Sequence, residues 1–269
     1  MKATVHRWRE LYDTAAAEPD WVRAHRWGYS EEVASRTIAD IREKLMLDSE
    51  HRLLEVGCGC GMVLSTLLQG NQTGVGIDFS HSLLAKAGAF GVSLQNIELI
   101  AGEAARLPAA DDSFDRVLCY SVFQCLPTPT YARRSLRELI RVCRPGGVIL
   151  VGDVFGCVER FRAAWQDGAP SIETARAAQA LPWLLPLRWT LTPLRWSFAL
   201  RHGIGDGRIG DDDDSLPRRH YSHQFFRRIG HECGCEVEIL PQIIPGRKSS
   251  RQRFDVRLMK AAPMDTSAD

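Results

Sequence analysis

The feature that most constrains this chain is a glycine-rich turn that joins an apolar run to an apolar helical pattern. Arg52–Val56 has the composition of a short strand, and Gly57-Cys58-Gly59-Cys60-Gly61 follows it at once. Apolar residues then recur at helical spacing, at Val63, Leu64, Leu67 and Leu68. A strand that turns so sharply into a helix needs glycine dihedrals, and the free N–H groups at the helix start favour an anionic ligand group. The sequence therefore predicts a strand–loop–helix unit that presents a ligand-binding turn.

Strand-like and helix-like segments alternate around this turn, which is typical of a parallel sheet built from βαβ units. The expected strands are Arg52–Val56, Gly74–Asp78, Ile97–Ala101, Phe114–Cys119, Val148–Val154, Glu236–Leu240 and Phe254–Met259. Helices are expected after caps at Ser30, Thr128 and Ser222, and Pro145-Gly146-Gly147 should stop the second of them. We therefore predict an α/β fold with a seven-stranded, mostly parallel sheet.

The alternation breaks after Phe155, where a segment dense in Trp, Leu and Pro follows. We expect an N-terminal helical cap over residues 1–34, a core over 35–156 and 222–260, a helical lid insertion over 157–221, and a flexible tail over 261–269. Trp8 and Tyr12 are aromatic residues of the cap that could cover a pocket or pack in the core.

Charge and cysteine usage exclude several classes of protein. The 34 Lys and Arg residues balance 33 Asp and Glu residues, so we expect no nucleic-acid partner. The N-terminus has no apolar signal region, and no run approaches the ~18 apolar residues of a stable membrane span. The pairs Cys58/Cys60 and Cys233/Cys235 lack the spacing of a zinc site, so we expect no metal. These features predict a cytoplasmic protein with free thiols, either a monomer or a homodimer.

Two acids define the chemistry of the predicted ligand. Glu55 stands two residues before the first glycine, where it would repel a phosphate and attract an ammonium or sulfonium group. Asp78 ends the next strand, at the distance expected of a carboxylate that accepts both hydroxyls of a ribose. Together they favour a cofactor that carries both an amino acid and a nucleoside.

At these residues the chain resembles the class I S-adenosylmethionine-dependent methyltransferases, which have a Rossmann-like fold, and within them the methyltransferase-type-11 group. Four segments carry the resemblance: LLEVGCGCG, GVGIDFS, GEAARLPAADDSFDRVLCYSVFQCLP and LRELIRVCRPGGVILVGD. The stretch from His220 through Val256 resembles, less specifically, bacterial methyltransferases of surface-polysaccharide and natural-product clusters.

The resemblance implies S-adenosylmethionine as the cofactor and assigns residues to its parts. Gly57, Gly59 and Gly61 would pack against the methionine part, and Asp78, followed by Phe79, would bind the ribose. Glu103 and Ala104 would lie along the adenine, with the acid pairing with its amino group. Glu103 is one methylene longer than the Asp that is more frequent in the family. Tyr120 and Ser121 would contact the amino end.

The chain departs from the family's pattern at Gln124, which stands where many relatives have His. A glutamine can orient a substrate but cannot act as a base at neutral pH. If the acceptor is a hydroxyl, a base must come from elsewhere, and His220, His223 or Tyr221 are the candidates at the junction of the insertion with the core. We expect an in-line methyl transfer with oxygen as the acceptor atom, and an insertion that binds a small-molecule, sugar or lipid-linked acceptor.

Two alternatives from other classes stay open on the sequence. An NAD-dependent oxidoreductase or epimerase would also use a glycine turn, but no Tyr-x-x-x-Lys motif follows the fourth expected strand. A non-catalytic protein that keeps the cofactor-binding fold as a scaffold would carry the same motifs. A comparison of NAD binding with S-adenosylmethionine binding distinguishes the oxidoreductase from a methyltransferase. Formation of a methylated product distinguishes a methyltransferase from the non-catalytic scaffold.

Overall fold

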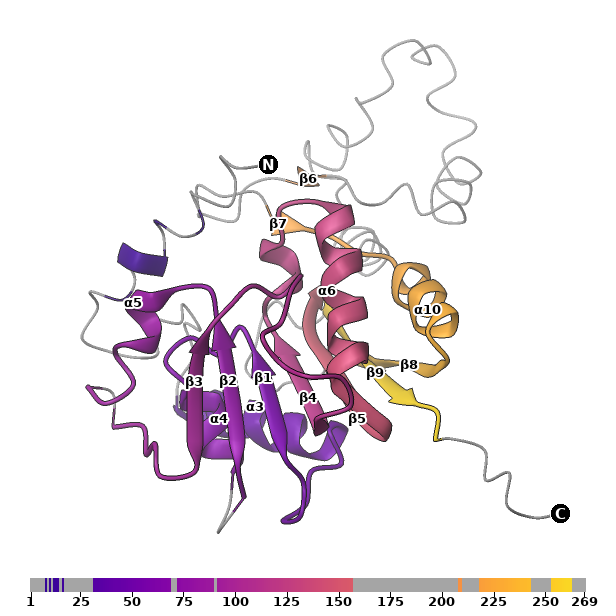
Figure 1. Cartoon of the computed structure of the whole chain (residues 1–269). Coiled ribbons are helices and arrows are strands. Elements are labelled where there is room, and N and C mark those ends of the chain that lie inside the picture. Colours follow the sequence, from indigo (N-terminus) through magenta and orange to yellow (C-terminus); the bar gives the residue numbers. More distant parts are fainter. Residues whose placement is uncertain are drawn as a thin grey trace, which may run out of the picture.

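The architecture is that of a computed structural model, which describes residues 8, 10, 12–14, 16, 31–68, 72–89, 91–156, 208–209, 218–242 and 253–262. A single central sheet runs through the described residues, with helices on both of its faces (Figure 1). The predictions for residues 17–30 and for most of the 157–221 insertion, the Ser30 cap among them, lie outside the described residues.

The central sheet has seven strands in the order β3-β2-β1-β4-β5-β9-β8. Their bounds are β1 Leu53–Val56, β2 Gly74–Asp78, β3 Ile97–Ala101, β4 Phe114–Tyr120, β5 Cys143–Phe155, β8 Cys235–Pro241 and β9 Arg253–Lys260. Strands β1 to β5 are parallel to one another, and β9 runs antiparallel to both β5 and β8. The predicted seven-stranded, mostly parallel α/β sheet is confirmed, and β1, which leads into the glycine turn, lies beside the central strand β4.

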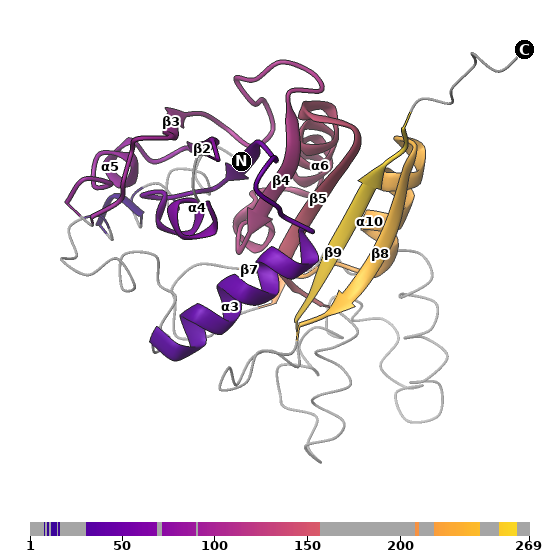
Figure 2. The same cartoon turned by 90° about the horizontal axis from the view of Figure 1, so that it is seen from below.

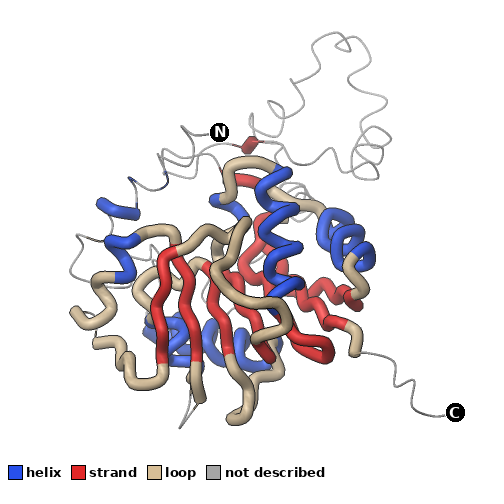
Figure 3. The backbone as a smooth tube through the Cα atoms, in the orientation of Figure 1, coloured by secondary structure: helices blue, strands red, loops and turns tan. Residues whose placement is uncertain are grey.

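Helices cover the sheet in two layers, each with its own apolar core (Figure 2). Helices α3 (Glu31–Lys44) and α4 (Met62–Leu67) bury side chains such as Ile41 and Leu64 against one face. Helices α6 (Pro129–Val142) and α10 (His223–Glu232) bury Leu136 and Phe226 against the other. The short helices α5 (His81–Leu84) and η1 (Phe123–Cys125) follow β2 and β4. The tube in Figure 3 shows these loops and helices bordering the red strands.

The capped helix starts that fall on described residues form as predicted. Thr128 accepts a hydrogen bond from the Tyr131 backbone N–H with Pro129 in the first turn of α6, and Ser222 accepts one from the Phe225 N–H at the start of α10. Gly234, at φ 71°, follows α10. These local signals depend on short-range geometry, so the sequence alone specifies them.

The start of β5 corrects the prediction. The expected strand began at Val148 after a Pro-Gly-Gly stop, whereas β5 begins at Cys143, directly after α6. Cys143 pairs with Phe114, and the register then shifts before regular pairing resumes at Val148. Gly146, at φ 75°, lies inside this irregular stretch. The Pro-Gly-Gly segment therefore follows the end of the helix as predicted but continues as distorted strand, because its flanks pair with β4.

A second, two-stranded sheet joins β6 (Arg208–Ile209) to β7 (Arg218–Arg219). Arg219 donates a hydrogen bond to the Leu126 carbonyl at 2.7 Å, so β7 is attached to the segment that follows β4. Within the described part of the chain, no helix combines the length and apolarity that crossing a membrane requires.

Candidate functional site

The glycine turn after β1 has the left-handed backbone that its sequence predicts. Gly57, Gly59 and Gly61 have φ angles of 79°, 57° and 80°, which residues other than glycine rarely tolerate. At Gly57 a Cβ atom would also overlap the Val122 Cγ2, so the loop after β4 presses directly against the turn. Glycine is therefore required at this position both for conformation and for space.

Asp78 ties the turn to the end of β2. Its Oδ2 accepts a hydrogen bond from the Gly59 N–H and its Oδ1 accepts one from the Ser80 N–H, both at 2.8 Å. The side chain is buried, and burial raises the pKa of this carboxyl, while the backbone donors act in the opposite direction. The Phe79 N–H donates a third backbone hydrogen bond to this carboxyl. A carboxylate has about four acceptor positions, so these three bonds leave room for a hydroxyl donor from a ligand.

Glu55 lies beneath the turn in a fully buried position. Burial is the main cause that raises the pKa of this carboxyl well above its usual range, and the charge of Asp78 adds to the effect. The carboxyl accepts a hydrogen bond from the Leu64 N–H in the first turn of α4. Its Oε2 has no hydrogen-bond partner among the described residues. A buried acceptor of this kind fits a ligand cation or another hydrogen-bond donor.

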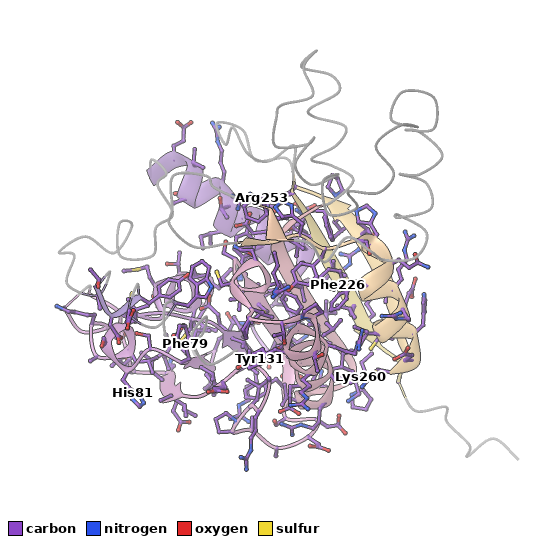
Figure 4. The ribbon with its side chains drawn as sticks, turned by 90° about the horizontal axis from the view of Figure 1, so that it is seen from above. Phe79, His81, Tyr131, Phe226, Arg253 and Lys260 are labelled. Carbon is purple, nitrogen blue, oxygen red and sulfur yellow. The ribbon has the colours of Figure 1, made fainter. Side chains whose placement is uncertain are left out.

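A cavity of about 610 Å³, its open mouth included, borders the turn and the ends of β1, β2 and β3. Its lining contains five of the predicted cofactor residues: Gly57, Asp78, Phe79, Glu103 and Ala104. The remaining lining residues are Trp8, Tyr12, Val56, Ile77, Gly102, Val122, Cys125, Leu126, Pro127 and Tyr131. Figure 4 labels Phe79 and Tyr131, whose side chains approach the cavity from the end of β2 and from α6. The cavity opens at the carboxyl ends of the parallel strands, where open α/β sheets bind ligands.

Several cavity residues were not assigned to the cofactor site on the sequence. Tyr12 contacts Phe79 edge-on, with ring centroids 5.9 Å apart, and its hydroxyl lies 3.8 Å from the Cys125 Sγ. Trp8 stacks on Tyr12 at 6.0 Å. Tyr131, on the first turn of α6, donates a hydrogen bond to Glu103. The aromatic character of Trp8 and Tyr12 in the sequence indicated that they could cover the cavity. Tyr131 lies at an ordinary helix start, and no feature of the sequence indicated its role.

Tyr120 and Ser121 lie at the end of β4, but neither lines the cavity. Tyr120 packs against Gly152 in the core beneath α3 and α4, and its hydroxyl accepts a hydrogen bond from Gln242 at 3.1 Å. Ser121, at φ 60°, hydrogen-bonds to Asp153. The side chain of Tyr120 is thus part of the core, so only its backbone could make the predicted contact with the cofactor.

A buried ionic network supports this edge of the sheet. Asp153, itself at φ 62°, forms an ion pair with Arg253 at 2.5 Å. The Asp255 carboxylate accepts from the Asp153 N–H at 2.8 Å and pairs with Lys44 of α3 at 2.6 Å. Burial raises the pKa of Asp255, and the facing Lys44 acts against it. Left-handed backbone at both Ser121 and Asp153 marks this edge as strained.

The three candidate bases lie around the start of α10, where His220 and Tyr221 are buried and His223 is half-buried. Tyr221 is buried, and its hydroxyl donates a 2.9 Å hydrogen bond to the Phe123 carbonyl. His220 is buried with its ring 5.3 Å from that of Phe155, and the His223 ring lies 4.5 Å from that of Phe254. None of the three candidates lines the cavity described above. For Tyr221 the structure argues against a role as base, because its proton serves a structural bond.

Gln124 lies in η1, between cavity residues Val122 and Cys125. It is buried, and its Oε1 has no hydrogen-bond partner among the described residues.

The described residues contain no group of three or more His, Cys, Asp and Glu side chains placed to hold a metal ion.

Comparison with known proteins agrees with this geometry. The methyltransferase-type-11 family model, described as a methyltransferase domain, matches residues 54–151. Methyltransferase GfsG of Streptomyces halstedii is 27% identical over 154 residues, which cover 55% of this chain and 54% of that protein. Phosphatidylethanolamine N-methyltransferase of Cereibacter sphaeroides is 37% identical over 108 residues, which cover 39% of this chain and 51% of that protein. The chain therefore spans about half the length of these curated relatives.

Among solved structures, the N-methyltransferase NodS from Bradyrhizobium japonicum, in complex with S-adenosylhomocysteine, has a TM-score of 0.58. The two chains are 14% identical, and the match covers 93% of this chain and 97% of that one. At this identity the likeness shows the fold alone. The sheet order is that of the Rossmann-like fold of class I S-adenosylmethionine-dependent methyltransferases, and the glycine turn and the acid at the end of β2 lie at the carboxyl ends of its strands. The similarity to the methyltransferase-type-11 family covers residues 54–151 of the chain.

The residues present fit the cofactor of this class. Gly57 and Asp78 both line the cavity, and Glu55 offers a buried acceptor oxygen without a partner in the described residues. No described feature supports the oxidoreductase alternative.

Proposed function

We propose that this protein transfers the methyl group of S-adenosylmethionine to a hydroxyl of a small-molecule, sugar or lipid-linked acceptor that has an apolar body. The apolar walls of the cavity, formed by Trp8, Val122, Leu126 and Pro127, support an acceptor or cofactor surface without charge. The observation that carries the choice of acceptor group is the buried Gln124 carboxamide oxygen, which has no hydrogen-bond partner among the described residues. Gln124 does not itself line the cavity, but its chain neighbours Val122 and Cys125 do.

The cofactor, when bound, supplies an electrophilic methyl group on a sulfonium. Asp78 would accept hydrogen bonds from the ribose hydroxyls while it holds Gly59 and Ser80 in place. Glu103 would pair with the adenine amino group, and the Glu55 carboxyl would attract the amino-acid end through its unpartnered oxygen. Positioning of this kind lowers reaction barriers by ~7–11 kcal/mol, so the chain's main task would be to hold the reactants and to exclude water.

On the acceptor side, Gln124 would accept a hydrogen bond from the acceptor's O–H and orient its oxygen. A carboxamide oxygen can also accept from an N–H, and one of the similar proteins named above is an N-methyltransferase of a phospholipid amine. A hydroxyl and an amine are therefore the two groups to compare, whereas a carbon nucleophile has no donor for this oxygen.

The test is transfer of labelled methyl from S-adenosylmethionine to matched sets of three acceptors, which differ only in carrying a hydroxyl, an amine or a methyl group at one position. We expect label in the hydroxyl members. Gln124→Met should lower kcat/KM about tenfold or more, because it removes the hydrogen-bond acceptor and keeps the volume. The matched control is Gln224→Met on the exposed side of α10. Label found only in amines, or only in carbon products, would reject the hydroxyl assignment.

The base is tested in the same assay. His220→Ala and His223→Ala are each compared with the wild type over a range of pH. Loss of a true general base should lower kcat by ~10²–10⁴-fold and leave cofactor affinity unchanged. If both variants keep their turnover, transfer proceeds by positioning alone. That outcome is favoured here, because neither ring lines the described cavity.

A further inference from the structure

Glu103 and Tyr131 meet at the wall of the cavity although they come from different parts of the chain. Glu103 belongs to the loop after β3, and Tyr131 to the first turn of α6. The Tyr131 hydroxyl donates a hydrogen bond to the Glu103 Oε2 at 3.2 Å. A carboxylate only accepts hydrogen bonds, so the phenol is the donor, and Oε1 is left for a second donor.

The two partners differ in how firmly the fold holds them. The backbone of Tyr131 is fixed, because its N–H donates to the Thr128 Oγ1 and its carbonyl accepts from the Ser135 Oγ, both at 3.0 Å. Its ring packs against the core on the α6 face of the sheet. The Glu103 side chain, in contrast, is exposed, and an exposed glutamate loses rotamer entropy when it is held in one position.

The backbone of Glu103 is anchored close to Asp78, which places its carboxylate at the cavity. The neighbouring Gly102 N–H donates to the Asp78 carbonyl at 2.9 Å, and the Glu103 carbonyl accepts from the Arg106 N–H at 2.9 Å. A Cβ at Gly102 would lie 2.9 Å from the Pro108 Cδ, so this turn is tightly packed. The free part is therefore the glutamate side chain, and Tyr131 is the group that orients it.

We propose that Tyr131 is a positioning residue that sets the selectivity of the cofactor site for a 6-aminopurine. The inference rests on the proposed function, in which Glu103 faces the adenine. An oriented carboxylate attracts the amino group of adenine, which donates hydrogen bonds, and repels a 6-oxo group, which accepts them. Tyr131 thus holds the Glu103 side chain, which is one methylene longer than an aspartate, in the orientation that the adenine amino group needs.

The test compares two ligands in two proteins by calorimetry. The ligands are S-adenosylhomocysteine and S-inosylhomocysteine, which differ only in the amino or oxo group at position 6. The proteins are the wild type and Tyr131→Phe, which keeps the ring and deletes the hydroxyl. We expect S-adenosylhomocysteine to bind the variant about three- to tenfold more weakly, the value of one hydrogen bond. Binding of the inosine ligand should change by less than about twofold, so the preference for adenine falls.

A Glu103→Ala background shows whether Tyr131 acts through the acid. In that background Tyr131→Phe should leave the affinity for S-adenosylhomocysteine unchanged. Equal weakening of both ligands by Tyr131→Phe, or an unchanged preference for adenine, would overturn the inference and assign Tyr131 to packing. Absence of any S-adenosylhomocysteine binding by the wild type would contradict the proposed function itself, and this inference with it. Melting temperatures of all variants identify any that fail to fold.

Discussion

Replacement of Gly57 by alanine should destabilise the protein through two separable effects. The first is the left-handed backbone at φ 79°, which costs a residue with a Cβ about 1–2 kcal/mol. The second is the overlap of the new Cβ with the Val122 Cγ2, and overpacking of this kind costs about 1–3 kcal/mol. We therefore expect a loss of about 2–5 kcal/mol in the free energy of unfolding.

The chain offers a control for each effect. Gly146 has φ 75°, but a Cβ added there would meet no atom beyond its chain neighbours within 4 Å, so Gly146→Ala reports the backbone strain alone. Val122→Ala removes the overlapping methyl groups, so Gly57→Ala/Val122→Ala should recover the steric part of the loss. Both Gly variants also reduce the freedom of the unfolded chain, an effect that cancels when they are compared.

The assay is urea unfolding of the ligand-free proteins, with S-adenosylhomocysteine affinity measured in parallel. Gly57→Ala should be less stable than Gly146→Ala by about 1–3 kcal/mol, and its ligand affinity should fall because the turn is displaced. If the two glycine variants are equally stable, or if Val122→Ala brings no recovery in the double variant, the close contact between the two loops is wrong.

Three further predictions concern buried polar groups. The folded state raises the pKa of Glu55, so the wild type loses stability as the pH increases from about 4.5 through that raised pKa. Glu55→Gln has no such group and should therefore gain stability relative to the wild type over this range, which pH-dependent melting curves measure. Tyr221→Phe should cost about 1 kcal/mol in unfolding free energy, by loss of the bond to the Phe123 carbonyl, and leave kcat unchanged; a large fall in kcat would restore the catalytic hypothesis. Arg253→Ala should cost about 3–5 kcal/mol, because it leaves the Asp153 carboxylate buried without its cationic partner; a loss below about 1 kcal/mol in urea unfolding would contradict this.

The parts of the fold that depend on local geometry could be predicted from the sequence. The glycine turn, the caps at Thr128 and Ser222, and the acid at the end of β2 each have a short-range physical cause. The start of β5 at Cys143 could not, because it depends on pairing with Phe114 on another strand. Strand pairing is a long-range property that a Pro-Gly-Gly signal does not report.

The site shows the same division. Gly57, Asp78, Phe79, Glu103 and Ala104 follow strands at predictable places and line one cavity. The orientation of residues at the end of β4 was not predictable, because every residue of that strand is buried and its pattern has no polar face. Tyr120 consequently points into the core rather than toward the cavity.

Tyr131 was missed for a different reason. Its contact with Glu103 spans two elements, and an aromatic residue in the first turn of an amphipathic helix carries no signal of a functional role. His220, Tyr221 and His223 were chosen for their place in the chain, yet their rings pack among aromatic side chains. Proximity in the sequence to an insertion does not determine which way a side chain points.

The ribose contact of Asp78 is the most direct test of the cofactor site. S-adenosylhomocysteine and its 2′-deoxy analogue are titrated by calorimetry into the wild type and into Asp78→Ala. We predict that the wild type prefers the intact ribose about tenfold or more, the value of a hydrogen bond to a charged group, and that the variant binds both ligands weakly with no preference. Because Asp78 also holds Gly59 and Ser80, general weakening alone would not decide the matter. A variant that still prefers the intact ribose as strongly as the wild type would contradict the assignment of Asp78 to the cofactor.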